Sequence, residues 1–160
     1  MAITVLRMRG FYSSEFVVQS SNQKSLKMAT IKNFEDLKAW QKARVLCQQI
    51  FEITQKEPFS RDYKLKDQIN GASGSVMDNI AEGFGRQGNN EFINFLTIAN
   101  GSAMEVKSQL YRALDRNYIL KEKFEELSSC ADEVSKMIFG LIAYLGKSDF
   151  RGQKFKAREK

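Results

Sequence analysis

The chain has 160 residues and a formal net charge of +6, with one proline, two cysteines and no histidine. This length corresponds to a single domain that can bury a core of its own. Without histidine, Ser-His-Asp catalysis, Cys-His catalysis and the Glu-x-x-His iron sites of ferritin-like bundles are excluded, and two cysteines are too few for a structural zinc site.

The first thirty residues show no repeating apolar pattern. Small polar residues interrupt this stretch at Ser13, Ser14, Ser20, Ser21 and Asn22. We therefore expect residues 1–30 to form a disordered extension. No apolar segment follows Arg7 and Arg9, so the extension is not a signal peptide. Met28 lies just before the first helical pattern, and residues 1–27 could be an upstream extension from a start codon assigned too early.

The first predicted helix begins after Asn33 and ends at Pro58. Asn33 is a favourable N-cap, and the acidic residues Glu35 and Asp36 suit the positive end of a helix. Pro58 ends the helix, because the residue before a proline resists the helical conformation. Apolar positions alternate by three and four along Leu37, Trp40, Ala43, Cys47, Ile50 and Thr54.

The second predicted helix runs from Arg61, capped by Ser60, to Phe84. Its apolar stripe consists of Leu65, Ile69, Ala72, Val76 and Ile80. Gly71 and Gly74 each cost roughly 1 kcal/mol of helix propensity relative to alanine. A helix tolerates that cost where another backbone packs very close, so we expect a close helix contact at this segment.

Two further helices are predicted over residues 90–117 and 121–146. The third helix has its seam at Phe92, Phe95, Ala99, Ala103, Val106, Leu110 and Ala113. The fourth has its seam at Phe124, Leu127, Ala131, Val134, Ile138, Leu141 and Leu145. The connections are short, so consecutive helices must be antiparallel neighbours. We therefore predict an all-α, up-down-up-down four-helix bundle over residues 31–147, followed by a basic tail over 148–160.

Three segments occur in an order that is typical of one protein family. They are FEDLKAWQKA at Phe34–Ala43, DNIAEGFGR at Asp78–Arg86 and FLTIANGSAMEVKSQL at Phe95–Leu110. Over Phe34–Leu145 the chain resembles the bacterial 23S rRNA intervening-sequence proteins. The resemblance implies a four-helix bundle that assembles into a homo-oligomeric ring, typically a pentamer. A related branch implies binding to a reverse transcriptase and to nucleic acid through a basic ring, as in accessory proteins of diversity-generating retroelements.

The chain departs from that family at basic positions. The family pattern reads like QIRRAAxSIPxNIAEG, whereas this chain has Asn70 and Gly71 in place of the two arginines and Met77 in place of the proline. Asn100 stands where a third arginine is usual. Residues 31–147 contain sixteen basic and sixteen acidic side chains, so all the excess positive charge lies in the two terminal segments.

The family-like segment DNIAEGFGR contains our candidate assembly residues, Asn79, Glu82, Gly83 and Arg86. Asn79 falls where the apolar stripe would next place a core residue, and a buried polar residue there can fix register or assembly state. Glu82 and Arg86 are spaced for an i,i+4 ion pair. A polar active cluster is the alternative, but no nucleophile–base pair accompanies these residues. We predict an oligomer interface.

Two other patterns near this segment have simpler interpretations. Gly83–Gly88 matches G-x-G-x-x-G, but a dinucleotide fingerprint needs a preceding strand, so we expect a glycine-rich helix end with a left-handed residue. The carboxylates of Asp78, Glu82 and Glu105 suggest a metal or acid–base site. The third helix runs back from the second, so Glu82 and Glu105 should lie roughly 20 Å apart. We predict no catalytic residue, no metal and no cofactor.

The C-terminal tail interleaves basic and aromatic residues without a core to serve. Its candidate nucleic-acid contacts are Arg151, Lys154, Phe155, Lys156 and Arg158. In such a tail, basic residues can attract the phosphates of single-stranded nucleic acid and aromatic residues can stack on its bases; the alternative is a merely solvated tail.

No apolar run approaches the roughly 20 residues that span a membrane. We expect a cytoplasmic, non-enzymatic, homo-oligomeric (pentameric) scaffold that binds RNA, DNA or a nucleic-acid enzyme such as a reverse transcriptase. The alternative is a purely self-assembling bundle with no nucleic-acid role.

Overall fold

The computed structural model describes residues 31–86 and 88–147, which form four long α-helices and two short 3-10 helices. The α-helices are α1 (Lys38–Thr54), α2 (Tyr63–Gly85), α3 (Asn89–Asp115) and α4 (Lys121–Gly146), and the 3-10 helices are η2 (Phe34–Asp36) and η3 (Phe59–Arg61). The predicted extension over residues 1–30 and the basic tail over 148–160 lie outside the described residues.

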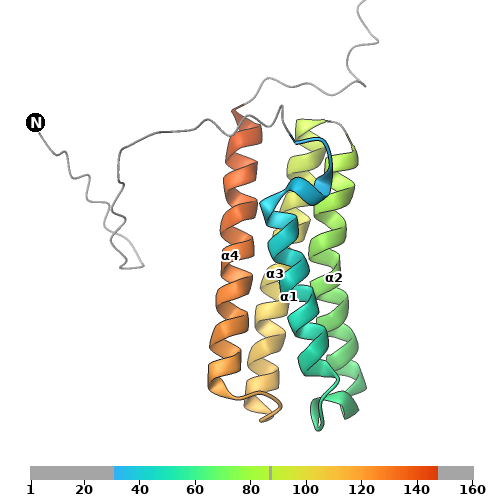
Figure 1. The fold of residues 1–160 in the computed structure, drawn as a ribbon, viewed down its shortest axis with the longest axis vertical. Helices are drawn as coiled ribbons and strands as arrows, with labels where there is room; N and C mark the ends of the chain where they lie inside the picture. Colours follow the sequence, from blue (N-terminus) through green and yellow to red (C-terminus); the bar gives the residue numbers. More distant parts are fainter. Residues whose placement is uncertain (1–30, 87, 148–160) are drawn as a thin grey trace, which may run out of the picture.

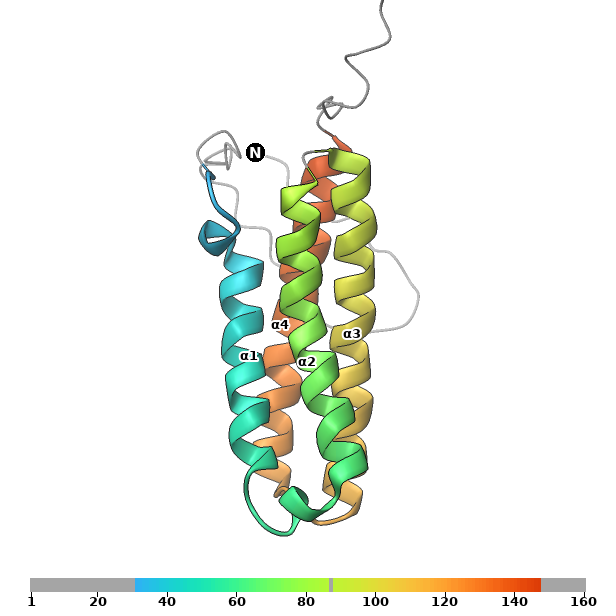
Figure 2. The same ribbon diagram turned by 90° about the vertical axis from the view of Figure 1, so that its right-hand side faces the viewer.

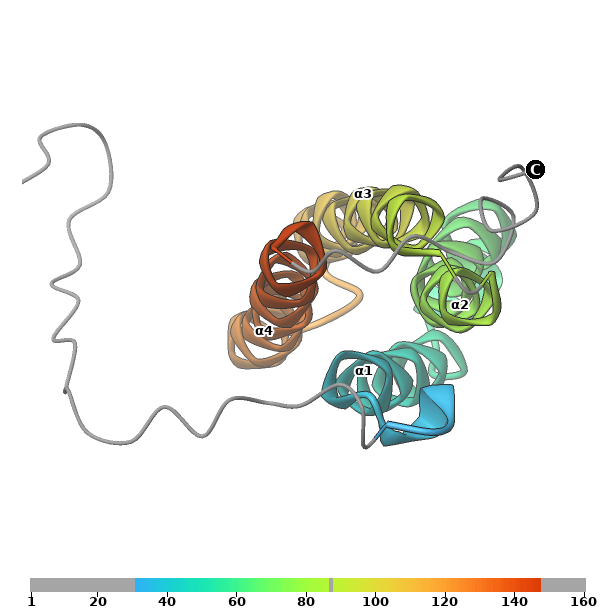
Figure 3. The ribbon, with the colours of Figure 1, turned by 90° about the horizontal axis from the view of Figure 1, so that it is seen from above.

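The four helices form one antiparallel bundle. Figure 1 shows the α1–α2 and α3–α4 connections at one end and the α2–α3 connection at the other. Seen along the bundle, the helices follow one another around the axis in chain order (Figure 3), and the side view in Figure 2 shows the same arrangement. The prediction of an all-α four-helix bundle with up-down-up-down topology is confirmed.

The core contains the predicted stripe of α2 in full, but the stripe predicted for α1 is partly wrong. Ala39, Leu46 and Ile53 take core positions. Trp40 and Cys47 lie instead on a flank of α1 and are only partly buried. The Cys47 flank faces α2, because Ser73 Oγ donates to Cys47 Sγ at 3.7 Å.

The predicted start and end of the first helix need correction. The backbone N–H of Asn33 donates to Asp36 Oδ2 at 3.2 Å, so Asn33 caps the start of the short helix η2 rather than that of α1. Helix α1 begins at Lys38 and ends at Thr54, before it reaches Pro58. The fourth helix has the predicted bounds.

Residue 87 lies outside the described residues, and neither Arg86 nor Gly88 on either side of it is the left-handed residue that we expected after α2. Arg86, the residue after α2, is right-handed, with φ −74° and ψ −10°. Gly88 is extended, with φ −140°, and α3 begins directly after it. The left-handed residue instead follows α3, where Asn117 has φ 57°.

Candidate assembly surface

The segment Asp78–Arg86 forms the last turns of α2, and Gly83 is its most constrained residue. Gly83 is buried against α3. A Cβ atom at this position would lie 2.6 Å from Phe95 Cβ and 2.8 Å from Phe92 Cδ2. Real Cβ atoms do not approach other carbon atoms so closely. Glycine is therefore what lets α2 and α3 meet at this point.

Glu82 and Arg86 form the predicted i,i+4 ion pair. The Arg86 guanidinium donates to Glu82 Oε1, and the side chains are 46% and 50% exposed for Arg86 and Glu82. The Arg86 guanidinium carbon also lies 5.2 Å from the centroid of the Phe95 ring, a cation–π contact. The Arg86 side chain therefore contacts α3 of its own chain, and both side chains keep about half of their surface in solvent.

Asn79 is half-buried, and the core position that we assigned to it belongs to Ile80. The Asn79 amide donates to the Ser75 carbonyl at 2.7 Å and to Ser75 Oγ at 3.0 Å. Ser75 Oγ lies 3.0 Å from Ser102 Oγ on α3. The amide is therefore satisfied, as its partial burial requires, and it belongs to a polar contact between α2 and α3.

The structure thus gathers Asn79, Glu82, Gly83 and Arg86 where α2 packs on α3. Gly83 and Asn79 have evident roles inside the chain, because they set the approach and the polar contact of the two helices. Glu82 and Arg86 expose polar atoms that another chain could reach. Their role in assembly stays a prediction.

A second surface runs along the outward side of α2, at spacings of three and four residues that place its members on one face of the helix. We define this outer α2 face by Asp67, Gly71, Gly74 and Asp78. Nothing lies within 4 Å of where a Cβ atom of Gly71 or Gly74 would stand. The close backbone contact that we expected at these glycines is therefore not made within the described chain.

The outer α2 face carries two carboxylates, and the exposed Lys64 lies one turn before the first of them. Among the described residues, neither Asp67 nor Asp78 has an ion-pair partner. Both side chains are exposed. The face is therefore flat at its centre, where the glycines lie, and carries an uncompensated carboxylate on either side of them.

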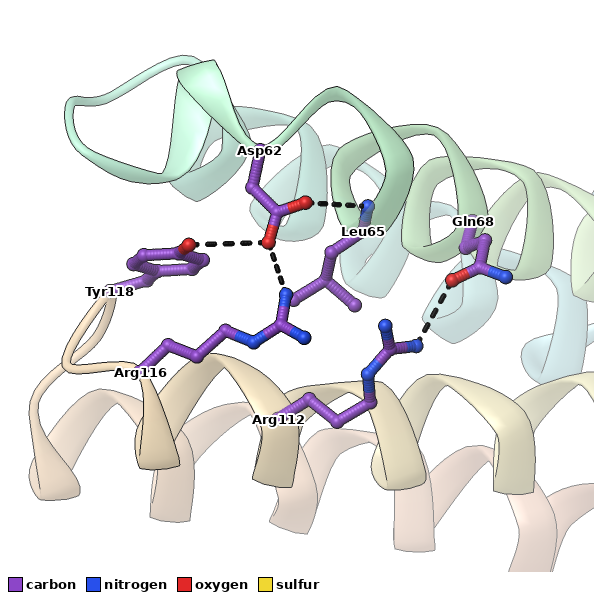
Figure 4. Close-up of polar contacts among 6 residues, drawn as sticks. All are labelled: Asp62, Leu65, Gln68, Arg112, Arg116 and Tyr118. Carbon is purple, nitrogen blue, oxygen red and sulfur yellow. Dashed lines mark hydrogen bonds and ion pairs between the residues drawn. The ribbon is translucent and has the colours of Figure 1, made fainter.

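A polar cluster at the other end of α2 was not predicted from the sequence (Figure 4). Asp62, rather than Ser60, caps the helix, because its Oδ1 accepts from the backbone N–H of Leu65 at 3.1 Å. Its Oδ2 accepts from the Tyr118 hydroxyl at 3.2 Å and forms an ion pair with Arg116. The Leu65 N–H first, and then Tyr118 and Arg116, hold the pKa of the Asp62 carboxyl below its usual value.

This cluster joins the start of α2 to the end of α3. A neighbouring contact extends it by one turn, because Arg112 donates to Gln68 Oε1 at 3.0 Å. The partners of Asp62 are more than fifty residues away in sequence. An aspartate two residues after a serine offered the only local signal, since both residue types are good N-caps.

The described residues offer little for redox or metal chemistry. Cys47 and Cys130 are both free, and burial raises the pKa of the Cys130 thiol. Within residues 31–86 and 88–147, no group of three or more cysteine or acidic side chains is arranged to hold a metal ion. Glu105 accepts from Gln109 Nε2 at 2.9 Å on its own helix, while Glu82 pairs with Arg86. In the same part of the chain, no helix is both long and apolar enough to cross a membrane.

Comparison with known proteins points to one family. The model of the 23S rRNA-intervening sequence protein family matches residues 35–140. A crystal structure from Bacteroides thetaiotaomicron, described as a protein with unknown function from the S23 ribosomal protein family, is 24% identical with a TM-score of 0.60. That match covers 65% of this chain and 97% of the other, and it shows a shared fold. No curated protein matches the chain.

Proposed function

This chain belongs to the 23S rRNA-intervening sequence protein family, and from that premise we propose that it is a non-enzymatic, homo-oligomeric helical scaffold. The family resemblance suggests a pentamer in the cytoplasm, and it suggests RNA, DNA or a nucleic-acid enzyme such as a reverse transcriptase as the partner. Family membership names a fold and leaves the function to be argued from sites. The observation that carries the proposal is the uncovered outer α2 face.

The two glycines of that face lower the helix propensity of α2 without allowing any closer packing inside the described chain. Each of Gly71 and Gly74 disfavours the helix by roughly 1 kcal/mol relative to alanine. Neither has another atom within 4 Å of its would-be Cβ, so neither glycine is needed for packing inside the bundle. A second chain that approaches this flat face would use the space that the glycines leave open. Self-assembly would thus explain why glycine occupies these two positions.

The proposed nucleic-acid contacts lie in the tail. Residues 31–147 have no net charge. At the two adjacent positions where relatives carry arginine, this chain has Asn70, whose amide donates to Thr54 Oγ1 at 3.0 Å, and Gly71, which has no side chain. Cations that could neutralise phosphates are therefore concentrated at Arg151, Lys154, Lys156 and Arg158, beside the aromatic Phe155.

Light-scattering mass of the full chain tests self-assembly. We expect a mass several times the 18.3 kDa of one chain. Gly71→Arg should lower that mass, because a long charged side chain would stand on the flat face. Gly140→Arg is the matched control, since Gly140 on α4 is also exposed with nothing within 4 Å of its would-be Cβ. A wild-type mass of one chain would overturn the proposal.

Salt-dependent binding to single-stranded nucleic acid tests the second part of the proposal. A few tail cations neutralise only a few phosphates, so binding should be weak with a shallow salt slope. Truncation to residues 28–147 should remove most of it. Retained binding would place the contact on the bundle. No binding by the full chain, and no nucleic-acid absorbance in the purified protein, would favour the alternative of a purely self-assembling bundle.

A further inference from the structure

The outward side of α1 carries one cation and one aromatic ring that the bundle leaves exposed. Arg44 and Phe51 are seven residues apart, so they lie on the same face of α1, and we call them the outer α1 pair. Phe51 is 57% exposed. Arg44 has no carboxylate partner among the described residues, and its guanidinium carbon lies 5.9 Å from the Trp40 ring centroid.

The outer α1 pair and the outer α2 face lie at matching heights along the bundle. Two contacts between α1 and α2 set the register: Cys47 is opposite Ser73, and Thr54 is opposite Asn70. Antiparallel helices with this register place position 44 level with position 78, and position 51 level with position 71. Positions 44 and 51 are seven residues, or about 10.5 Å, apart along α1, and positions 71 and 78 are the same distance apart along α2.

We propose that in the assembled protein the outer α1 pair of one copy docks on the outer α2 face of the next copy. Arg44 then faces the unpaired carboxylate of Asp78, and the Phe51 ring covers the flat surface at Gly71. This inference rests on the self-assembly proposed above and names the two surfaces that meet. The contact is heterologous, so its repetition around one axis forms a ring when the rotation closes.

Ring symmetry supplies the physical reason for this pairing. Rotation about an axis parallel to the bundle moves each copy around the ring without changing the height of any residue. Helix α1 of one copy therefore meets α2 of the next in antiparallel orientation and in the same register as inside one chain. Charge and shape are complementary in that register: a cation meets a carboxylate, and a ring meets a glycine.

The alternative contact, between two outer α2 faces, is disfavoured by charge. Such a symmetric contact would bring the carboxylates of Asp67 and Asp78 of both copies to one interface. Juxtaposed like charges oppose association. Docking the outer α1 pair on this face instead brings the Arg44 guanidinium to Asp78 and keeps the two acidic faces apart.

A charge swap in the full chain tests the inference. Arg44→Asp and Asp78→Arg should each shift the light-scattering mass toward the 18.3 kDa of one chain. The double variant, with the two charges exchanged, should recover most of the wild-type mass, because only residues in direct contact compensate each other. Lys136→Glu on α4 is the control, since Lys136 is exposed and forms no ion pair within the described helices.

The aromatic part of the contact has an equally close control. Phe51→Ser should lower the mass, whereas Phe139→Ser on α4 should not, although both rings are 57% exposed in the single chain. Circular dichroism should show that every variant stays helical. If the wild-type protein is an oligomer and the changes at Arg44, Asp78 and Phe51 all leave its mass unaltered, the inference is wrong while self-assembly stands. A monomeric wild-type protein overturns both.

Discussion

Helix α2 contains two glycines whose surroundings are opposite. Gly83 lies against α3, where a Cβ atom would stand 2.6 Å from Phe95 Cβ. Gly71, twelve residues earlier, is exposed, with nothing within 4 Å of its would-be Cβ. The first glycine is explained completely by packing within the chain. The second has no packing neighbour among the described residues. Gly101 on α3 and Gly140 on α4 are equally open, so our proposal rests on two open glycines, Gly71 and Gly74, that lie three residues apart on one face of α2.

The comparison also separates two kinds of inference from a sequence. A glycine in a helical pattern indicates a close approach, but it does not say what approaches. At Gly83 the approaching atoms belong to the same chain, whereas no atom of the described residues packs against Gly71. The family-like segment around Gly83 therefore serves first of all to pack α2 closely on α3. In our proposal, assembly depends mainly on the outer α2 face, which spans Asp67 to Asp78 and overlaps that segment only at Asp78.

The largest expected effect comes from filling the space at Gly83. Gly83→Val should destabilise the fold by about 3 kcal/mol, because its side chain would overlap Phe92 and Phe95 and force α2 away from α3. This corresponds to a fall in melting temperature of about 10 °C. Gly85→Val is the control, since Gly85 is exposed and has open space around it. Equal melting temperatures for the two variants would remove the contrast.

Periodicity predicted the fold because it depends on many residues at once. The stripe from Leu65 to Ile80 is buried as expected, and the four helices follow from repeated apolar spacing and short connections. Single-residue assignments were less secure where neighbours compete. Asn79 and Ile80 both continue the stripe, and packing on α3 places Ile80 in the core.

The candidate site was predictable only in its local part. The Glu82–Arg86 pair follows from spacing along one helix. The cluster around Asp62 could not be predicted, because its partners Arg116 and Tyr118 come from a distant segment that only the folded bundle brings near. The open side of Gly71 was equally invisible, since a sequence does not show which side of a helix lacks a neighbour.

The second prediction concerns the end of α2 that is fixed within the chain. Asp62→Ala should destabilise the protein by about 2 kcal/mol, because it removes the cap of α2 together with the acceptor for Arg116 and Tyr118. Ser60→Ala should change the melting temperature much less, since Ser60 caps no helix in the structure. A larger effect at Ser60 would show that the helix begins where the sequence suggested.

The contribution of Asp62 should depend on pH in a definite direction. Its pKa is lower in the folded protein than in the unfolded chain, so the unfolded chain binds more protons in acid. The stabilisation is therefore complete above the unfolded value of about 4 and is lost as the pH falls through the lower folded value. Wild type and Asp62→Ala should differ in urea midpoint at pH 7 and converge toward pH 2.

The third prediction sharpens the interpretation of Gly71. In open space on a helix, Gly→Ala should stabilise by up to about 1 kcal/mol. Gly140→Ala should show that gain, because Gly140 is exposed on α4 and lies on neither proposed contact surface. Gly71→Ala should gain less than Gly140→Ala when the protein is assembled, since the added methyl group would meet the Phe51 ring of the next copy. Equal gains in thermal melts would argue that Gly71 is open in solution too.

The smallest effect is expected from removing residues 1–27. A segment of the same chain is another candidate to cover the outer α2 face, and this segment lies outside the described residues. Its sequence has no periodic apolar stripe, so it can bury little surface, and its net charge is positive only through a few separated residues. We therefore expect melts of the full chain and of a protein beginning at Met28 to agree within a few degrees, with unchanged light-scattering mass. If the deletion lowers the melting temperature strongly and the mass stays that of one chain, the segment itself covers the bundle. Gly71 would then be explained within one molecule, as Gly83 is.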